Sequence, residues 1–129
     1  IRAENLGVRN LKIINEDIYE VLTKHIADHT IDAFHIFFPD PWPKRRQHKR
    51  RLLQPSFIEI LSSKLKHGGR MNIATDWLPY AQEIEKNFAS NSDFTGGVIP
   101  RPEWRPLTKF ESKGITKEHV VTDLQYRRK

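Results

Sequence analysis

The 129-residue chain is long enough for one folded domain with a single core, because a domain of this size buries roughly two-thirds of its unfolded surface. No apolar run reaches the roughly 18 residues that cross a bilayer, and no signal peptide begins the chain, so we expect a soluble, cytoplasmic protein. The absence of cysteine excludes disulfides and thiolate metal sites, and the six histidines predict no metal ion. The net charge of +6 favours an acidic partner such as nucleic acid.

The first segment, residues 1–7, has the pattern of a helix end, with Gly7 as a left-handed cap. Because this pattern begins at Ile1 and not at a methionine, we expect further sequence upstream. Residues 11–15 are β-branched and predict a short strand. Apolar residues at positions 18, 21, 22 and 26 then predict a helix, with Asp17 as a candidate N-cap.

The middle of the chain alternates strands with helices. A near-continuous apolar run over residues 31–38 predicts a central parallel strand that is covered on both faces. Pro55 favours a helix start, and this helix is expected to end at the glycine pair 68–69. Residues 70–75 predict a strand, and residues 79–89 predict another helix. The order indicates an α/β fold with a doubly wound parallel sheet.

The last third of the chain has a different pattern. Three prolines make residues 99–107 an extended connection that is poor in strand. Thr108 and Glu111 have the spacing of a capping box. The alternation over residues 120–127 predicts a half-buried antiparallel strand at an edge of the sheet. We therefore expect one domain over residues 1–129.

Three acidic residues follow the predicted strands, at their carboxyl ends: Asp17, Asp40 and Asp76. Ligands of open α/β sheets bind outside these ends, so the convergence of three acids there favours a reaction site. Taken singly, Asp17 and Asp76 could cap helices, and Asp40 could favour a turn. Trp42 and Trp77 follow two of these acids closely and could each stack on a base, whereas packing in the core is expected of the third tryptophan, at position 104.

A basic segment follows Asp40. Residues 44–51 hold six Lys or Arg in eight positions, which suits contact with the phosphates of nucleic acid. A solvated charged face or a localisation tag is the alternative. We favour nucleic-acid contact, because a tag has no reason to begin four residues after a strand-end carboxylate.

Six motifs resemble the bacterial tRNA (guanine-N7-)-methyltransferase family. They are Asn-Glu-Asp at 15–17, Phe-Phe-Pro-Asp-Pro-Trp at 37–42, Lys-Arg-Arg at 49–51, Gly-Gly at 68–69, Ala-Thr-Asp-Trp at 74–77 and Arg-Pro-Leu-Thr-Lys-Phe-Glu at 105–111. The resemblance covers essentially the whole chain. It implies a class I (Rossmann-like) methyltransferase fold, S-adenosylmethionine as the cofactor, and methyl transfer to N7 of a guanine in the tRNA variable loop.

The resemblance also implies roles for individual residues. Asp17 would contact the adenine region of the cofactor, and Asp40 would be the catalytic and cofactor-side acid. Lys44 and Asp76 correspond to substrate positions. The implied RNA contacts are Arg46, Gln47, His48, Lys49, Arg50 and Arg51, and the implied substrate-binding quartet is Thr108, Lys109, Phe110 and Glu111.

Two parts of the family's cofactor site have no counterpart in the sequence: the glycine-rich loop after the first strand and the acid after the second. The implied strand order is 3-2-1-4-5-7-6, so residues 11–15 would form the third strand and would touch only a missing second strand. We therefore expect the C-terminal two-thirds of a methyltransferase domain, which lacks its first two strands and is inactive as it stands. Residues from 31 onward could still form a sheet.

Two other classes of protein are compatible with parts of the pattern. A non-enzymatic RNA-binding module would explain the basic segment but not the three strand-end acids. A methyltransferase that acts on an amino group of DNA or protein would need an acceptor for the proton of its substrate nitrogen.

Overall fold

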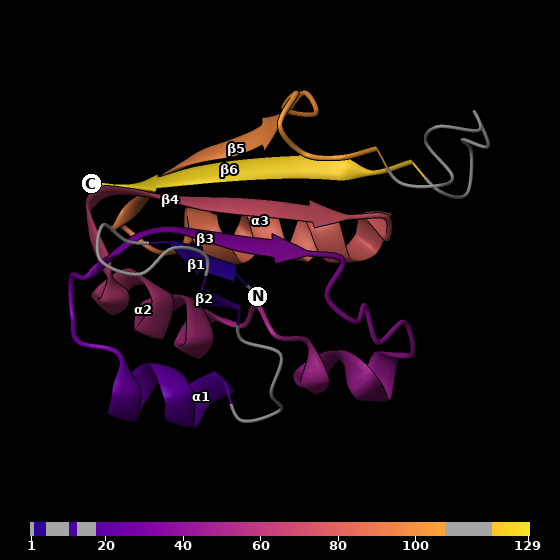
Figure 1. Ribbon diagram of the computed structural model, residues 1–129. Helices are drawn as coiled ribbons and strands as arrows, with labels where there is room; N and C mark the ends of the chain where they lie inside the picture. Colours follow the sequence, from indigo (N-terminus) through magenta and orange to yellow (C-terminus); the bar gives the residue numbers. More distant parts are fainter. Residues whose placement is uncertain (1, 5–10, 13–17, 108–119) are drawn as a thin grey trace.

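The computed structural model describes residues 2–4, 11–12, 18–107 and 120–129, the side chains from residue 18 onward. Within these residues, six strands form one sheet in the order β2-β1-β3-β4-β6-β5 (Figure 1). The elements are β1 (Arg2–Glu4), β2 (Leu11–Lys12), α1 (Ile18–Glu20) with a π-helical continuation (Val21–His25), β3 (Ile31–Phe37), a 3-10 helix (Arg45–Arg50), α2 (Pro55–Lys64), β4 (Leu65–Thr75), α3 (Leu78–Ala89), β5 (Phe94–Ile99) and β6 (Thr122–Arg128).

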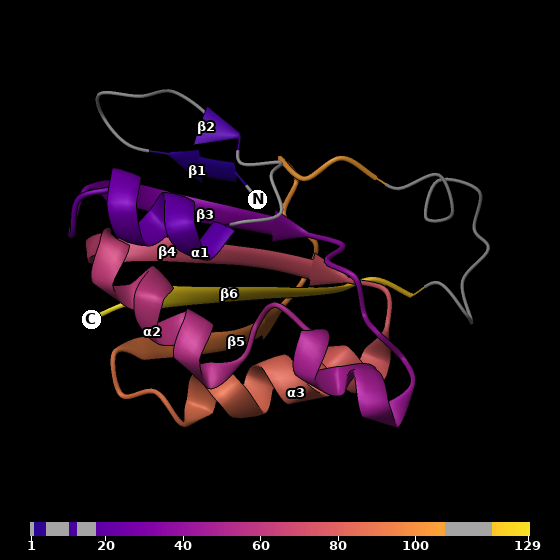
Figure 2. The same ribbon diagram turned by 90° about the horizontal axis from the view of Figure 1, so that it is seen from below.

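The sheet from β3 onward has the order that the resemblance implied. β3 and β4 are parallel, and β6 runs antiparallel between β4 and β5. The sequence β3-β4-β6-β5 therefore reproduces positions 4-5-7-6 of the class I methyltransferase sheet. This order confirms the α/β fold class and the expectation that residues from 31 onward form a sheet. The expected doubly wound parallel sheet is not seen in the described residues, because β6 pairs antiparallel with β4 and β5 and the helices lie on one face (Figures 1 and 2).

All three helices pack on one face of this sheet (Figures 1 and 2). Alternate residues of β3 and β4 point into this layer, and removing their apolar surface from water supplies the main stabilisation. None of the helices that the structure describes is long and apolar enough to span a membrane. The core includes Phe34, Ile36, Met71, Ile73, Leu124 and Tyr126 from the sheet, with Ile18, Leu22, Phe57, Leu61, Tyr80 and Ile84 from the helices.

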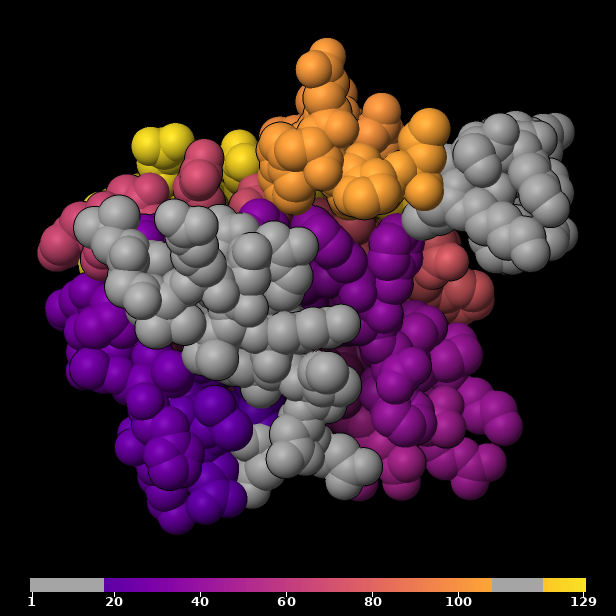
Figure 3. Space-filling view, viewed as in Figure 1, coloured from indigo at the N-terminus to yellow at the C-terminus, as the bar shows by residue number. Residues whose placement is uncertain are grey.

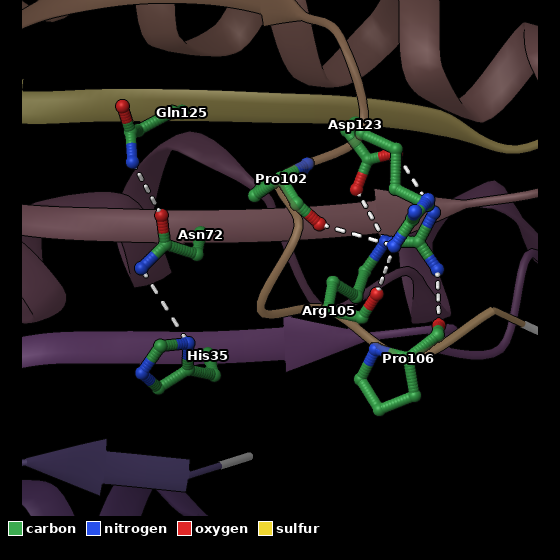
Figure 4. Close-up of polar contacts among 8 residues, drawn as sticks. His35, Asn72, Pro102, Arg105, Pro106, Asp123 and Gln125 are labelled. Carbon is green, nitrogen blue, oxygen red and sulfur yellow. Dashed lines mark hydrogen bonds and ion pairs between the residues drawn. The ribbon is translucent and has the colours of Figure 1, made fainter.

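The opposite face of the sheet carries a row of polar side chains from three neighbouring strands. Gln125 Nε2 donates to Asn72 Oδ1 at 2.8 Å, and Asn72 Nδ2 lies 3.4 Å from His35 Nδ1 (Figure 4). His35 and Asn72 are buried. The segment after β5 extends to this face, where the ring of Trp104 lies 5.2 Å from His35 and 6.1 Å from Phe37. The second face is therefore held by hydrogen bonds and ring contacts.

The start of the chain differs from the expectation. Residues 2–4 form a strand and not a helix end, and β1 pairs antiparallel with both β3 and β2. The edge of β3 presents backbone N–H and C=O groups that need partners, and an extended segment supplies them. The strand at residues 11–12 consequently has a neighbour, which the expected order did not give it.

Two boundaries also differ. α2 ends at Lys64 because Leu65 is extended, buried and paired with Ile31, so β4 begins before the glycines and includes them. β6 is not an edge strand, because β5 pairs along its outer side. The glycine pair within β5 hides this strand in the sequence. A Cβ at Gly96 would lie 2.1 Å from the Gln125 carbonyl oxygen, so glycine is needed there.

Two buried tyrosines predict that the chain loses stability in alkali. Burial raises the pKa of Tyr80 and of Tyr126 to about 12, whereas tyrosines of the unfolded chain ionise near pH 10. Their stabilising contribution is complete below pH 10 and is lost as pH rises through 12, by about 2 kcal/mol each at pH 12.

The prediction can be checked by urea unfolding between pH 8 and pH 12. Among the described residues the Tyr126 hydroxyl makes no hydrogen bond, so Tyr126→Phe removes the titration without removing such a bond. This variant should lose about half of the pH-dependent fall in unfolding free energy. An unchanged pH dependence in Tyr126→Phe would contradict the prediction.

Candidate functional site

The parallel strands β3 and β4 end side by side, and the two loops that follow carry two of the three predicted acids. The Phe38 N–H donates to the Ala74 carbonyl at 2.7 Å, which continues the pairing to the end of β3. Asp40 lies in the loop after β3, and Asp76 directly follows β4. Both side chains are exposed at the carboxyl edge of the sheet, where open α/β sheets bind ligands.

The structural alternatives for these acids find no support in their contacts. α3 has Trp77 as its N-cap residue and no side-chain cap, so Asp76 does not cap this helix. Within the described part of the chain, neither Asp40 nor Asp76 accepts a hydrogen bond or joins an ion pair. Both carboxylates can therefore meet a ligand. Asp17, the third predicted acid, lies outside the described residues.

The loop that carries Asp40 has an unusual backbone. Phe38 and Trp42 have φ angles of +54° and +43°, in the left-handed region that bulky residues rarely adopt. Each such residue costs about 1–3 kcal/mol and persists only where the surroundings hold it. We define residues 38–44 as the Asp40 loop. Its conformation depends on contacts from outside the loop.

Arg51 makes one of these contacts and joins it to α3. Its Nε donates to the Pro41 carbonyl at 2.6 Å, and its Nη1 donates to Glu83 Oε2 at 2.8 Å. Its guanidinium carbon lies 5.0 Å from the centre of the Tyr80 ring. Glu83 and Tyr80 both belong to α3, so Arg51 ties the Asp40 loop to that helix.

Neighbouring contacts fix the segment that returns from the 3-10 helix to α2. The Leu53 N–H donates to the Tyr80 hydroxyl at 3.1 Å, and Asn87 Nδ2 donates to the Leu53 carbonyl at 2.9 Å. Gln54 Nε2 donates to the His48 carbonyl at 2.9 Å. The C-terminal end of the basic segment is therefore anchored to α3.

The exposed cations of the 3-10 helix form a surface beside Asp40, which we call the basic surface. Arg50 lies over Trp42, with its guanidinium carbon 5.2 Å from the ring centre, so one face of this tryptophan is already occupied. Three of the cations, at positions 44–46, line a shallow concavity of about 730 Å³. The basic surface consists of Lys44, Arg45, Arg46, Lys49 and Arg50.

Three residues of the basic segment are less accessible than the sequence suggested. Gln47 and His48 are half-buried, and His48 Nε2 lies 3.3 Å from the Pro43 carbonyl oxygen. Arg51 is buried, with 3% of its side chain exposed. Its Nε and Nη1 donate to the Asp40 loop and to Glu83, so its surroundings differ from those of the exposed cations.

A second buried arginine anchors the segment that leads toward residue 108. Arg105 is 1% exposed, and its Nε and Nη2 donate to the two carboxylate oxygens of Asp123 at 2.5 and 2.9 Å (Figure 4). Its Nη1 donates to the Pro106 carbonyl at 3.0 Å, and its guanidinium carbon lies 6.0 Å from the centre of the Phe38 ring. Arg105 thus fixes this segment to β6 beside the Asp40 loop.

Sequence reasoning did not single out Arg105 or Asp123 as anchors. The available signals were an arginine at the start of a recognised motif and an acid inside a predicted strand. Trp104 was expected in the core, but 52% of it is exposed, because only one side of its ring packs on the sheet. The quartet at residues 108–111 lies outside the described residues.

Residues 1–124 match the model of a family described as "Putative methyltransferase". The chain belongs to this family.

Curated relatives give a more specific name. The chain is 42% identical to the tRNA (guanine-N(7)-)-methyltransferase of Streptomyces avermitilis, over 98% of this chain and 45% of the relative. Proteins of the same name match in Psychromonas ingrahamii, at 47% identity over 98% of this chain and 54% of the relative, and in Chromobacterium violaceum, at 48% over 93% and 54%. The chain spans about half the length of the curated relatives it matches.

Solved structures also match. One of them is the crystal structure of a SAM-dependent O-methyltransferase from Thermotoga maritima, which is 19% identical and has a TM-score of 0.41. The match covers 81% of this chain and 35% of that protein.

We predict that each partner of the Arg105–Asp123 pair becomes destabilising when the other is removed. Arg105→Met leaves the Asp123 carboxylate buried without its guanidinium, so this variant should lower the unfolding free energy by about 3–5 kcal/mol. Asp123→Asn removes the charge that accepts two Arg105 hydrogen bonds, so it should also lower the unfolding free energy. The double variant Arg105→Met/Asp123→Leu should recover most of this loss, because no charge is then buried.

Chemical denaturation of the four proteins measures these differences, and Lys24→Ala is the matched control. Lys24 pairs with Glu20 at 3.3 Å, but their side chains are 67% and 48% exposed, so its loss should cost less than about 0.5 kcal/mol. Single variants at the Arg105–Asp123 pair that cost no more than Lys24→Ala would contradict this prediction.

Proposed function

We propose that the intact protein transfers a methyl group from S-adenosylmethionine to N7 of a guanine in the tRNA variable loop, in the cytoplasm. The observation that carries this proposal is the exposed, unpaired Asp40 carboxylate beside the basic surface, at the carboxyl edge of a class I sheet. The relatives at 42–48% identity support the choice of substrate through their names.

The chemistry of guanine N7 suits this arrangement. N7 carries a lone pair and no proton, so its attack on an electrophilic methyl group requires no general base, and catalysis depends on alignment and electrostatics. Positive charge develops on the purine during transfer, and a fixed carboxylate nearby favours that change. Asp40 can also accept hydrogen bonds from the guanine N1–H and amino group, which would orient the base.

The described residues fit part of a cofactor site. S-adenosylmethionine, when bound, supplies the activated methyl group on a cationic sulfonium. The Asp40 carboxylate, which joins no ion pair within the described residues, suits this charge, and Phe38 offers a ring that is 40% exposed at the same edge. Asp17, which the resemblance places at the adenine region, would complete the cofactor contacts of this chain.

The first test is Asp40→Asn in the intact protein. The substitution keeps the size of the side chain and removes the charge, so we expect turnover to fall by about two orders of magnitude, comparable to the loss of one preorganised electrostatic contact. The affinity for tRNA should stay within about twofold. Mass spectrometry of tRNA nucleosides measures 7-methylguanosine.

This assay also separates the proposal from its main alternative. A non-enzymatic RNA-binding module would use the basic surface alone and would yield no 7-methylguanosine from wild-type protein, although tRNA still bound. Turnover equal to wild type in Asp40→Asn would refute the role of Asp40 in particular.

The second test concerns the basic surface. Phosphate contacts release counterions, so tRNA affinity should fall with salt, and each lost contact should reduce the slope of log affinity against log salt by about 0.7–0.9. We expect Arg46→Gln/Lys49→Gln to reduce the slope by about 1.4–1.8. Fluorescence anisotropy with labelled tRNA between 50 and 200 mM salt provides the measurement.

A charge-matched control isolates the site. Lys24→Gln/Lys86→Gln removes the same charge from two exposed positions that do not belong to the basic surface. Its slope should equal that of the wild type. Equal slopes for both double variants would mean that the basic surface does not contact the RNA.

A further inference from the structure

We propose that Arg51 positions the Asp40 loop for methyl transfer and does not contact RNA. This inference rests on the proposed function and assigns a separate role to one member of a motif whose arginines otherwise look equivalent. Arg50 and Arg51 are adjacent in the chain, yet Arg50 is exposed, whereas only 4% of the surface of Arg51 is exposed. The two neighbours therefore meet different surroundings.

The Arg51 guanidinium is inaccessible to a phosphate. Nε and Nη1 already donate to the protein, and Nη2 is buried with no hydrogen-bond partner. An RNA phosphate could reach this group only after the loop had moved. Glu83 also neutralises the charge at 2.8 Å, so Arg51 adds little to the field of the basic surface.

The Asp40 loop depends on hydrogen-bond donors from outside the loop. Prolines at positions 39, 41 and 43 have no backbone N–H, so the loop has three fewer donors with which to form the hydrogen bonds of a turn. Their carbonyl oxygens remain available. Arg51 occupies the Pro41 oxygen and His48 approaches the Pro43 oxygen at 3.3 Å.

The hydrogen bond from Arg51 to the Pro41 carbonyl lies directly beside Asp40 in the chain. The Pro41 carbonyl follows Asp40 by one residue and precedes Trp42, whose φ of +43° needs support. The other end of the guanidinium is held by Glu83 and by the Tyr80 ring. Because Arg51 is bound to α3, a twelve-residue helix, it holds the peptide beside the Asp40 carboxylate at a fixed place relative to that helix.

The test uses Arg51→Met and Arg51→Lys in the intact protein. Methionine keeps an unbranched side chain without donors, and lysine keeps the charge without the planar fork. Both variants should lower kcat for 7-methylguanosine formation at least tenfold. The Kd for tRNA and its salt slope should stay within about twofold of wild type. A lower slope with unchanged kcat would overturn the proposal.

Arg50→Met is the adjacent control, because it removes an exposed cation of the basic surface. It should weaken tRNA binding and reduce the salt slope by about 0.7–0.9. If Arg51→Met and Arg50→Met gave the same loss of slope, Arg51 would be an RNA contact.

The substitution Glu83→Gln should affect tRNA binding differently depending on whether Arg51 positions the loop or contacts RNA. If Arg51 positions the loop, this variant should lower kcat without changing tRNA affinity, and Arg51→Met/Glu83→Gln should be no worse than Arg51→Met alone. If Arg51 contacts RNA, Glu83→Gln should free the guanidinium, and tRNA should bind more tightly with a steeper salt slope.

Hydrogen exchange of the same intact proteins separates this inference from the proposed function. Arg51→Lys and Glu83→Gln should speed amide exchange over residues 38–50 and leave the amides of β3 and β4 protected. If the wild-type protein formed no 7-methylguanosine, the proposed function would be refuted. Hydrogen exchange would still test whether Arg51 holds the Asp40 loop. Unchanged exchange over residues 38–50 in both variants would overturn the role of Arg51, and folding of either variant is monitored by the protection of β4.

Discussion

The parallel pairing of β3 with β4 is the constraint on which the candidate site depends. These strands are buried and are hydrogen-bonded to each other as far as Phe38. Their carboxyl ends therefore lie at the same edge of the sheet, and the two loops that follow begin side by side. β6 and β5 extend the same sheet and bring the segment before residue 108 to that edge. The space-filling view shows the described segments of the site on neighbouring parts of one molecule (Figure 3). Because the strands fix the origin of each loop, only the loop conformations remain to be set.

Two buried arginines set those conformations. Arg51 joins the Asp40 loop to α3, and Arg105 joins the segment before residue 108 to β6. Burying a guanidinium is costly unless it is paired and hydrogen-bonded, and an apolar pair often serves stability equally well. The forked geometry of arginine has a different advantage, since one side chain can bind a carboxylate and a backbone carbonyl in fixed directions. Both arginines do this, which suits the precise placement of irregular segments.

The sequence predicted the parts of the fold that depend on periodicity. The apolar runs of β3 and α3 identified those elements because burial repeats with the geometry of the element. β5 was missed because its two glycines contribute no side chain to a pattern, and β1 was missed because pairing with β3 decides its conformation. For the site, the positions of Asp40 and Asp76 followed from strand ends. The burial of Arg51 did not, because its partners Glu83 and Tyr80 lie about 30 residues away in sequence.

The contrast between adjacent residues shows how one motif can divide its roles. A run of arginines has uniform chemistry, but the end of the 3-10 helix at Arg50 turns the next side chain inward. Arg50 remains on the surface over Trp42, whereas Arg51 enters the protein beneath Pro41. Affinity for a polyanion needs exposed charge, and placement of a carboxylate needs a buried clamp. The reversal of direction at one peptide allows the same residue type to meet both requirements, and it connects the surface that would hold the RNA backbone to the loop that would hold the base.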